Sequence, residues 1–233
     1  MILQKDMVSR FAYIPRTLSY FDANLKAKHV LEHDVLAAFQ QPIVILAPPG
    51  MGKTRLMERL GEQDNHRFIR ATSFLRQPNE LLPATTRLVI DGLDEVASVS
   101  DDDPLHQVLY KLLVCGKPPF VISCRDAEWR GATANLGVAE EYELAPCQRN
   151  LAPLTSSEAL TALTSLFEPE RAQAALRRLD EVGLEEFYTN PLLLDFVAAI
   201  IETKDEIPET RAALYEQAVG QLRFEHNKRH RDR

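Results

Sequence analysis

The chain has 233 residues, enough for one large domain or two small ones at about 150 residues per domain. Apolar residues make up 45% of it and charged residues 26%, which is typical of a soluble globular protein with a sizeable core. Lys and Arg number 27 against 34 Asp and Glu, giving a net charge of -7. This balance argues against broad binding to nucleic acid or to an anionic membrane, because both need a basic surface.

The cysteines and the apolar runs indicate where the protein works. Cys115, Cys124 and Cys147 have neither the even number of a disulfide framework nor the spacing of a zinc site, which favours a reducing compartment. The first residues lack the apolar stretch of a signal peptide. The longest apolar run, 192–201, contains Asp195 and is shorter than the roughly 20 residues that cross a bilayer. We expect a cytoplasmic protein with no membrane segment.

Short apolar runs alternate with helical patterns as far as residue 152, which predicts a parallel sheet built from βαβ units. Continuous apolar runs are typical of parallel strands covered on both faces. The predicted elements, in chain order, are an edge strand at 11–14, an amphipathic helix at 30–39, a strand at 42–47, a helix at 52–61, strands at 67–71 and 87–91, a helix at 105–114, and strands at 119–123 and 142–145.

From Thr155 onward the pattern is helical only. Thr155 and Glu158 form a capping box, in which the hydroxyl and the carboxylate satisfy free N–H groups at the start of a helix. Further helices are predicted at 169–182, 192–203 and 208–228. The predicted organisation is therefore a lead-in segment at 1–40, a core domain at 41–152 and a helical domain at 153–233.

Residues 47–54, Ala-Pro-Pro-Gly-Met-Gly-Lys-Thr, match the Walker A pattern G-x-x-x-x-G-K-[ST], with Ala47 in place of the first glycine. Gly50 and Gly52 permit the turns that aim successive N–H groups at a phosphate. The helix that follows directs its positive end at the same anion. Lys53 is placed to reach the β- and γ-phosphates, and the Thr54 hydroxyl to bind Mg²⁺. The fold class that follows is α/β, a P-loop NTPase sheet covered by helices, with a small all-helical domain after it.

Two further strand ends carry charged residues. Asp91 ends an apolar strand, where a carboxylate is placed to hold Mg²⁺, and Asp94 and Glu95 are placed to orient or deprotonate a water. Arg125 follows the next apolar strand, and two roles stay open for it: sensing a γ-phosphate or forming an ordinary salt bridge. Residues 227–230 read Asn-Lys-Arg-His, which differs at its last position from the Asn-Lys-x-Asp signature of guanine binding. No such signature follows a predicted strand, and this favours adenine over guanine.

Together these residues resemble a NACHT module, a branch of the STAND class of signalling P-loop NTPases. Residues 88–95, Leu-Val-Ile-Asp-Gly-Leu-Asp-Glu, are similar to the family's extended Walker B motif, and 123–125, Ser-Cys-Arg, resemble its sensor 1 strand end. Residues 151–155 look like the entry to its first helical domain. The run Asn-Pro-Leu-Leu-Leu at 190–194 resembles the motif whose proline packs on adenine, and 210–215 is similar to the helix after it.

The resemblance implies ATP or ADP with Mg²⁺ as the cofactors. Mg²⁺ would lie between Thr54 and Asp91, hydrolysis would use Asp94 and Glu95, and Arg125 would sense the γ-phosphate. The residues that it implies for nucleotide binding are Pro49, Gly50, Met51, Gly52, Lys53, Thr54 and Arg55, with Pro191 at the base.

The function that the resemblance implies is a slowly hydrolysing ATP-dependent switch in immune-type or antiviral signalling, with a protein partner or self-assembly as its output. The alternatives are a scaffold that keeps nucleotide for structure, an AAA+-like ATPase, and a kinase, for which no acceptor pattern is recognisable. Family members continue into a winged-helix domain, whereas this sequence ends near the first helical domain. We therefore expect either a fragment of a longer protein or a minimal form that works with a partner.

Overall fold

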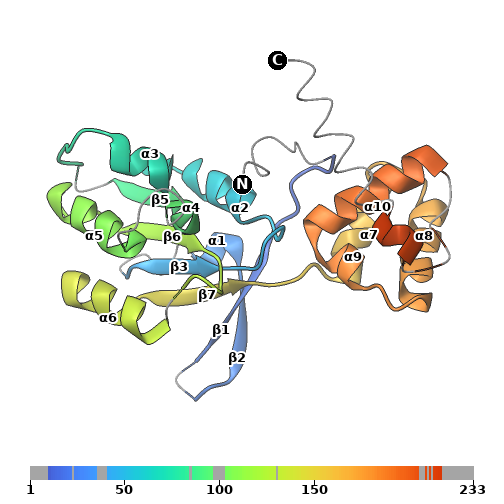
Figure 1. Cartoon of the computed structure of the whole chain (residues 1–233), viewed down its shortest axis with the longest axis horizontal. Coiled ribbons are helices and arrows are strands. Elements are labelled where there is room, and N and C mark those ends of the chain that lie inside the picture. The colour runs from blue at the N-terminus through green and yellow to red at the C-terminus, as the bar shows by residue number, and fades with distance from the viewer. Residues whose placement is uncertain are drawn as a thin grey trace. The chain divides into compact units, whose positions relative to one another are not determined.

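The computed structural model describes residues 10–22, 24–35, 41–83, 86–96, 103–129, 131–204, 208, 210 and 212–216. The chain divides into two units (Figure 1). The sheet unit is Pro15–Ala152, and the helical unit contains residues 10–14 and the described residues from 153 onward. The hairpin strands at 17–31 belong to the sheet unit, within the segment that the sequence analysis set apart as a lead-in.

Seven strands form one sheet in the order β2-β1-β7-β3-β6-β5-β4. Neighbours from β7 to β4 pair in parallel, whereas β1 pairs antiparallel with both β7 and β2. Strand β6 lies between β3 and β5, so its carboxyl end lies between theirs. The strands are β1 (Thr17–Phe21), β2 (Ala27–Leu31), β3 (Ile43–Leu46), β4 (His66–Arg70), β5 (Arg87–Asp91), β6 (Phe120–Cys124) and β7 (Cys147–Leu151).

Helices cover both faces of this sheet, and the alternation of side chains along each strand explains how. Ile43 and Ile45 pack in one core cluster with α1 (Glu32–Val35) and α2 (Lys53–Gly61). Val44 and Leu46, which point the other way, pack in a second cluster with the remaining helices. Those helices are α3 (Ala71–Arg76), α4 (Leu93–Val96), α5 (Pro104–Val114) and α6 (Gly131–Tyr142). The prediction that the apolar strands are covered on both faces is thereby confirmed.

The helical unit is built around its own core. It contains α7 (Ser156–Thr164), α8 (Pro169–Glu181), α9 (Glu186–Thr189) and α10 (Pro191–Lys204), and residues 212–216 are also helical. The predicted capping box is present, because the Thr155 hydroxyl accepts from the Glu158 N–H and the Glu158 carboxylate accepts from the Thr155 N–H. Of the helix predicted at 208–228, residues 208 and 210 are not helical, and 209, 211 and 217–228 lie outside the described residues. No helix in the described part of the chain has the length and apolar character needed to cross a bilayer.

Two predictions near the N-terminus are wrong. Residues 11–14 form no strand, because Phe11 is buried in the core of the helical unit and Ile14 packs against that core. The helix predicted at 30–39 does not include Val30, which lies in β2 opposite Leu18 of β1. Its helical part is α1 alone, and residues 36–40 lie outside the described part of the chain.

The strand predicted at 142–145 is also wrong. Tyr142 is the last residue of α6, and its hydroxyl donates to the carbonyl of Pro118. The strand lies at 147–151 instead, where it has mostly polar residues. Polar side chains are tolerated there because they find partners: Gln148 donates to Asn135 of α6, and Arg149 stacks over the Tyr20 ring.

Candidate functional site

The loop between β3 and α2 has the geometry of a phosphate-binding loop. Gly50 and Gly52 have φ of 81° and 85°, a region that side chains disfavour, so both glycines are required by the turn. Gly52 is the N-cap of α2 and supplies no side chain to cap it. The first N–H groups of α2 therefore stay available to an anion, which the helix dipole also attracts. The fold is that of a P-loop NTPase.

Lys53, the first residue of α2, turns back over this loop. Its ammonium donates to the carbonyl oxygen of Ala47 at 2.6 Å. Burial lowers the pKa of Lys53, with Asp94 opposing and Arg125 adding to the shift. The lysine is a half-buried cation held at the centre of the loop, where a phosphate would gain most from it because desolvation strengthens electrostatic attraction.

Asp91 ends β5 beside this lysine and is almost fully buried. Its carboxylate accepts hydrogen bonds from the Ser123 hydroxyl, at 2.6 Å, and from the Thr54 side chain. Burial raises the pKa of Asp91, while those two hydrogen bonds and the charges of Arg70 and Lys53 oppose the rise.

The donor set fits Mg²⁺. Thr54 and Asp91 offer a hydroxyl and a carboxylate oxygen on adjoining elements, and Mg²⁺ in nucleotide sites is commonly held by one or two such groups together with the phosphates. No cluster of three or more His, Cys, Asp or Glu residues suited to a metal occurs among the described residues. Two protein ligands suit a metal that is held together with a phosphate.

Ser123, in the middle of the site, was not assigned a role from the sequence. Its side chain is fully buried, donates to Asp91 and accepts from the Gly92 N–H at 2.9 Å. Gly92 has a φ of 77°, and a Cβ there would lie 3.1 Å from the Glu95 carboxyl carbon, so glycine is strongly favoured. Ser123 thus fixes the end of β5 from the neighbouring strand. The topology that places β6 beside β5 is what reveals this role.

Arg125 pairs with Asp94, its Nε lying 2.8 Å from Asp94 Oδ2. This is the salt bridge that the sequence left open as one role of Arg125. The Asp94 side chain is only 9% exposed, and its second oxygen, Oδ1, has no hydrogen-bond partner among the described residues. A buried carboxylate oxygen without a partner is uncommon and marks Asp94 as a site that can accept another donor.

Glu95 lies on α4 next to these charges. Burial raises the pKa of Glu95, Asp91 and Asp94 raise it further, and Arg70 and Arg125 oppose the rise. Arg70 ends β4 in register with Asp91 on β5. Arg70 has no local motif in the sequence, and its place as a charged residue at the end of a predicted parallel strand is the available signal. A carboxylate with a raised pKa beside a phosphate loop is suited to accept a proton from water.

The other predicted nucleotide residues take different places. Pro49 is exposed in the loop, and Arg55 is exposed on the first turn of α2. Met51 is buried in the core cluster, so its side chain anchors the turn. Pro191 begins α10 in the helical unit, after Asn190, whose side chain accepts from the Leu192 N–H. Its role at the base therefore stays a prediction.

Comparison with known proteins gives a match among solved structures only. No family model matches the chain, and no curated protein matches it. Among solved structures, the chain is similar to domain III of the replication initiation protein DnaA from Thermotoga maritima, with 14% sequence identity and a TM-score of 0.43. The match covers 82% of this chain and 88% of that one. Assignment of the fold rests on the strand order and the loop geometry described above.

Proposed function

We propose that this chain binds ATP or ADP with Mg²⁺ at the carboxyl edge of its parallel sheet and hydrolyses ATP slowly. The observation that carries the proposal is the convergence of chemically distinct groups from separate elements at one edge. Lys53 and Thr54 come from α2, Asp91 from β5, Glu95 from α4 and Arg125 from the end of β6. Parallel α/β sheets bind their ligands at this edge.

Each of these groups has a distinct part in the proposed hydrolysis. The loop N–H groups and Lys53 hold the phosphates, and Thr54 and Asp91 hold Mg²⁺, which neutralises charge on the phosphates. Glu95 accepts a proton from the attacking water as its oxygen bonds to the γ-phosphorus and the bond to the leaving ADP oxygen breaks. Arg125 exchanges part of its pairing with Asp94 for the γ-phosphate, so ATP and ADP leave the ion pair in different states.

The finer proposal is that the chain is a NACHT-type STAND switch. It is supported by the sequence motifs at 88–95, 123–125 and 190–194. On this proposal the difference between ATP and ADP at Arg125 controls assembly with a partner or with further copies, in immune-type or antiviral signalling in the cytoplasm. The base would be adenine, in agreement with the lack of a guanine signature in the sequence.

Single-turnover hydrolysis of radiolabelled ATP tests the proposal. We expect wild type to release phosphate. The Glu95→Gln variant should bind ATP but release phosphate at least about 100-fold more slowly, a typical contribution of a general base. Glu143→Gln is the matched control, because Glu143 is an exposed glutamate outside the site. Equal rates for wild type and E95Q would contradict a catalytic role and favour the scaffold. Preference for GTP over ATP would refute the assignment of adenine as the nucleobase.

A further inference from the structure

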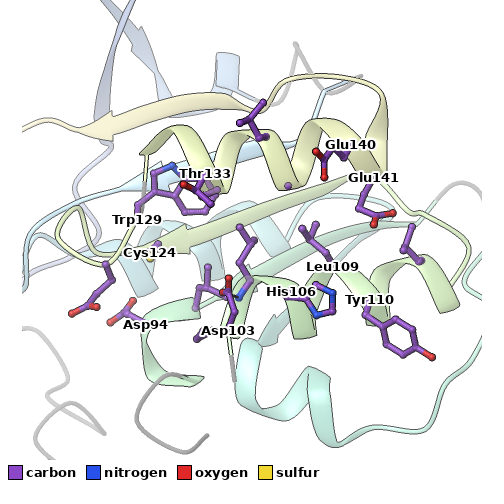
Figure 2. Close-up of a pocket in the computed structure, with 18 residues that line it drawn as sticks. Asp94, Asp103, His106, Leu109, Tyr110, Cys124, Trp129, Thr133, Glu140 and Glu141 are labelled. Carbon is purple, nitrogen blue, oxygen red and sulfur yellow. Dashed lines mark hydrogen bonds between the residues drawn. The ribbon is translucent and has the colours of Figure 1, made fainter. Parts of the chain in front are cut away.

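A groove separate from the phosphate loop runs between α5 and α6, on the face of the sheet opposite α2 (Figure 2). Its volume is about 520 Å³, within the range of roughly 300–1,000 Å³ that small-molecule sites occupy. All of its lining residues lie in the sheet unit. Tyr110 and Leu136 on its walls are 63% and 62% exposed, so the groove presents apolar surface to solvent.

The charges of this groove are of one sign. Five carboxylates line it and no Lys or Arg does so among the described residues. Figure 2 shows Asp94 near Trp129 at one end, Glu140 and Glu141 at the other, and Leu109 between them. The carboxylates are Asp94, Asp103, Glu128, Glu140 and Glu141.

Spacing distinguishes an extended organic cation from a metal ion as the ligand. Thr133 and Glu140 line the groove seven positions apart on α6, about 10 Å at 1.5 Å per residue. Asp94 lies at one end of the groove and Glu140 and Glu141 at the other, so these carboxylates do not converge on one point, and no metal-type cluster occurs among the described residues. Between the two ends the wall has the apolar residues Leu105, Leu109 and Ala134 together with Asp103 and His106. A ligand that fits carries positive charges at both ends of an aliphatic chain.

Asp94 has one carboxylate oxygen that the described residues leave without a partner. Its Oδ2 pairs with Arg125, but its Oδ1 is buried and has no hydrogen-bond partner in the described structure. An ammonium group donates hydrogen bonds and carries the opposite charge, so it is a suitable partner for this carboxylate. Trp129, which is 8% exposed, lines the same groove.

Gly137 keeps the groove open. It lies inside α6, where glycine is less favourable than alanine by up to about 1 kcal/mol, and its φ is not positive. A Cβ on Gly137 would have only Leu109 Cδ1 near it, at 4.0 Å, which is an ordinary contact. Neither the backbone nor the packing of this helix requires a glycine here. A side chain larger than alanine would project into the groove between its charged ends.

We propose that this groove binds an aliphatic polyamine, with one ammonium at Asp94 and another at Glu140 and Glu141. The site lies outside the phosphate loop, and binding there does not require nucleotide. Because Asp94 also pairs with Arg125, the amine and the nucleotide site share one carboxylate.

Isothermal titration of the full chain with spermidine, without nucleotide or Mg²⁺, tests the proposal. We expect one spermidine per chain, and n-butylamine, which has one charge, to bind at least tenfold more weakly. Gly137→Leu should weaken spermidine binding at least tenfold by filling the groove, whereas the matched Gly137→Ala should bind like wild type. Helical circular dichroism and the Tm of each variant without ligand establish that it is folded.

A pair of charge variants separates a built site from general attraction by a net charge of -7. E140Q/E141Q removes two groove carboxylates and should bind spermidine about tenfold more weakly. E143Q/E170Q removes two exposed carboxylates outside the groove, brings the net charge to the same -5 (-7 + 2), and should leave the affinity unchanged. Equal affinities in all four variants, or no binding by wild type, would overturn the proposal.

Discussion

Replacing Ser123 by alanine is expected to destabilise the sheet unit out of proportion to the single oxygen removed. The Ser123 hydroxyl is fully buried, donates to Asp91 Oδ1 at 2.6 Å and accepts from the Gly92 N–H at 2.9 Å. A hydrogen bond to a charged group contributes about 1.5–3 kcal/mol, and a buried N–H left without a partner costs about 1–3 kcal/mol. We therefore expect the free energy of unfolding to fall by about 3–5 kcal/mol at pH 7.

The decrease in the free energy of unfolding caused by S123A should depend on pH, in a direction set by Asp91. Burial raises the pKa of Asp91, so the folded state binds this proton more tightly than the unfolded state. The stability contributed by protonated Asp91 is present at low pH and is lost as the pH rises through the folded pKa. Without Ser123 that pKa rises further. The destabilisation by S123A should therefore be largest at neutral pH and shrink as Asp91 takes up its proton.

Urea unfolding of wild type and S123A, from pH 7 down through the folded pKa of Asp91, measures the change in the free energy of unfolding. Ser73→Ala is the matched control, because Ser73 is exposed on α3, and its effect should stay within about 0.5 kcal/mol. In the D91N background the charge-assisted part of the loss is absent but the Gly92 N–H still loses its partner, so S123A should cost only about 1–3 kcal/mol. The reasoning fails if the cost at pH 7 is below 1 kcal/mol, or if it is the same with and without D91N.

Three further perturbations test other parts of the account. Arg125→Ala leaves the buried Asp94 carboxylate without its counter-ion and should lower the free energy of unfolding by about 2 kcal/mol, most of which D94N should restore. Thr155→Ala removes the N-cap of α7 and should cost about 1 kcal/mol in urea unfolding; a cost no greater than that of Ser157→Ala, an exposed first-turn control, would contradict the capping role. Because burial raises the pKa of Glu95, single-turnover hydrolysis should fall as the pH drops through that raised pKa, above the ordinary 4.5, and a pH–rate profile without this acid limb would refute Glu95 as the base.

The elements that follow the simplest patterns could be predicted from the sequence. The strand at 87–91 and the helix after the phosphate loop carry strong local signals, namely a continuous apolar run and the glycines of a turn. The capping box at Thr155 is likewise local, because both partners lie within one turn. These predictions succeeded because each depends on residues that are neighbours in the chain.

What the sequence did not reveal depends on contacts between distant segments. Strand β7 has polar residues that are tolerated only because Asn135 and Tyr20 pack on them. Phe11 looked like part of an edge strand but belongs to the core of the helical unit. In the site, Ser123 and Arg70 acquire their roles from the order of β4, β5 and β6 in the sheet. Strand order is not encoded in any local pattern, so these roles were out of reach.

Equilibrium binding of ATP with Mg²⁺ to wild type and to the Lys53→Ala variant tests the central claim most directly. Lys28→Ala is the control, because Lys28 is a half-exposed lysine on β2, away from the phosphate loop. Loss of charged hydrogen bonds to phosphate should weaken binding by K53A at least tenfold while K28A binds like wild type. Wild type and K53A binding ATP with the same affinity, or wild type binding none, would contradict a nucleotide site at this edge of the sheet.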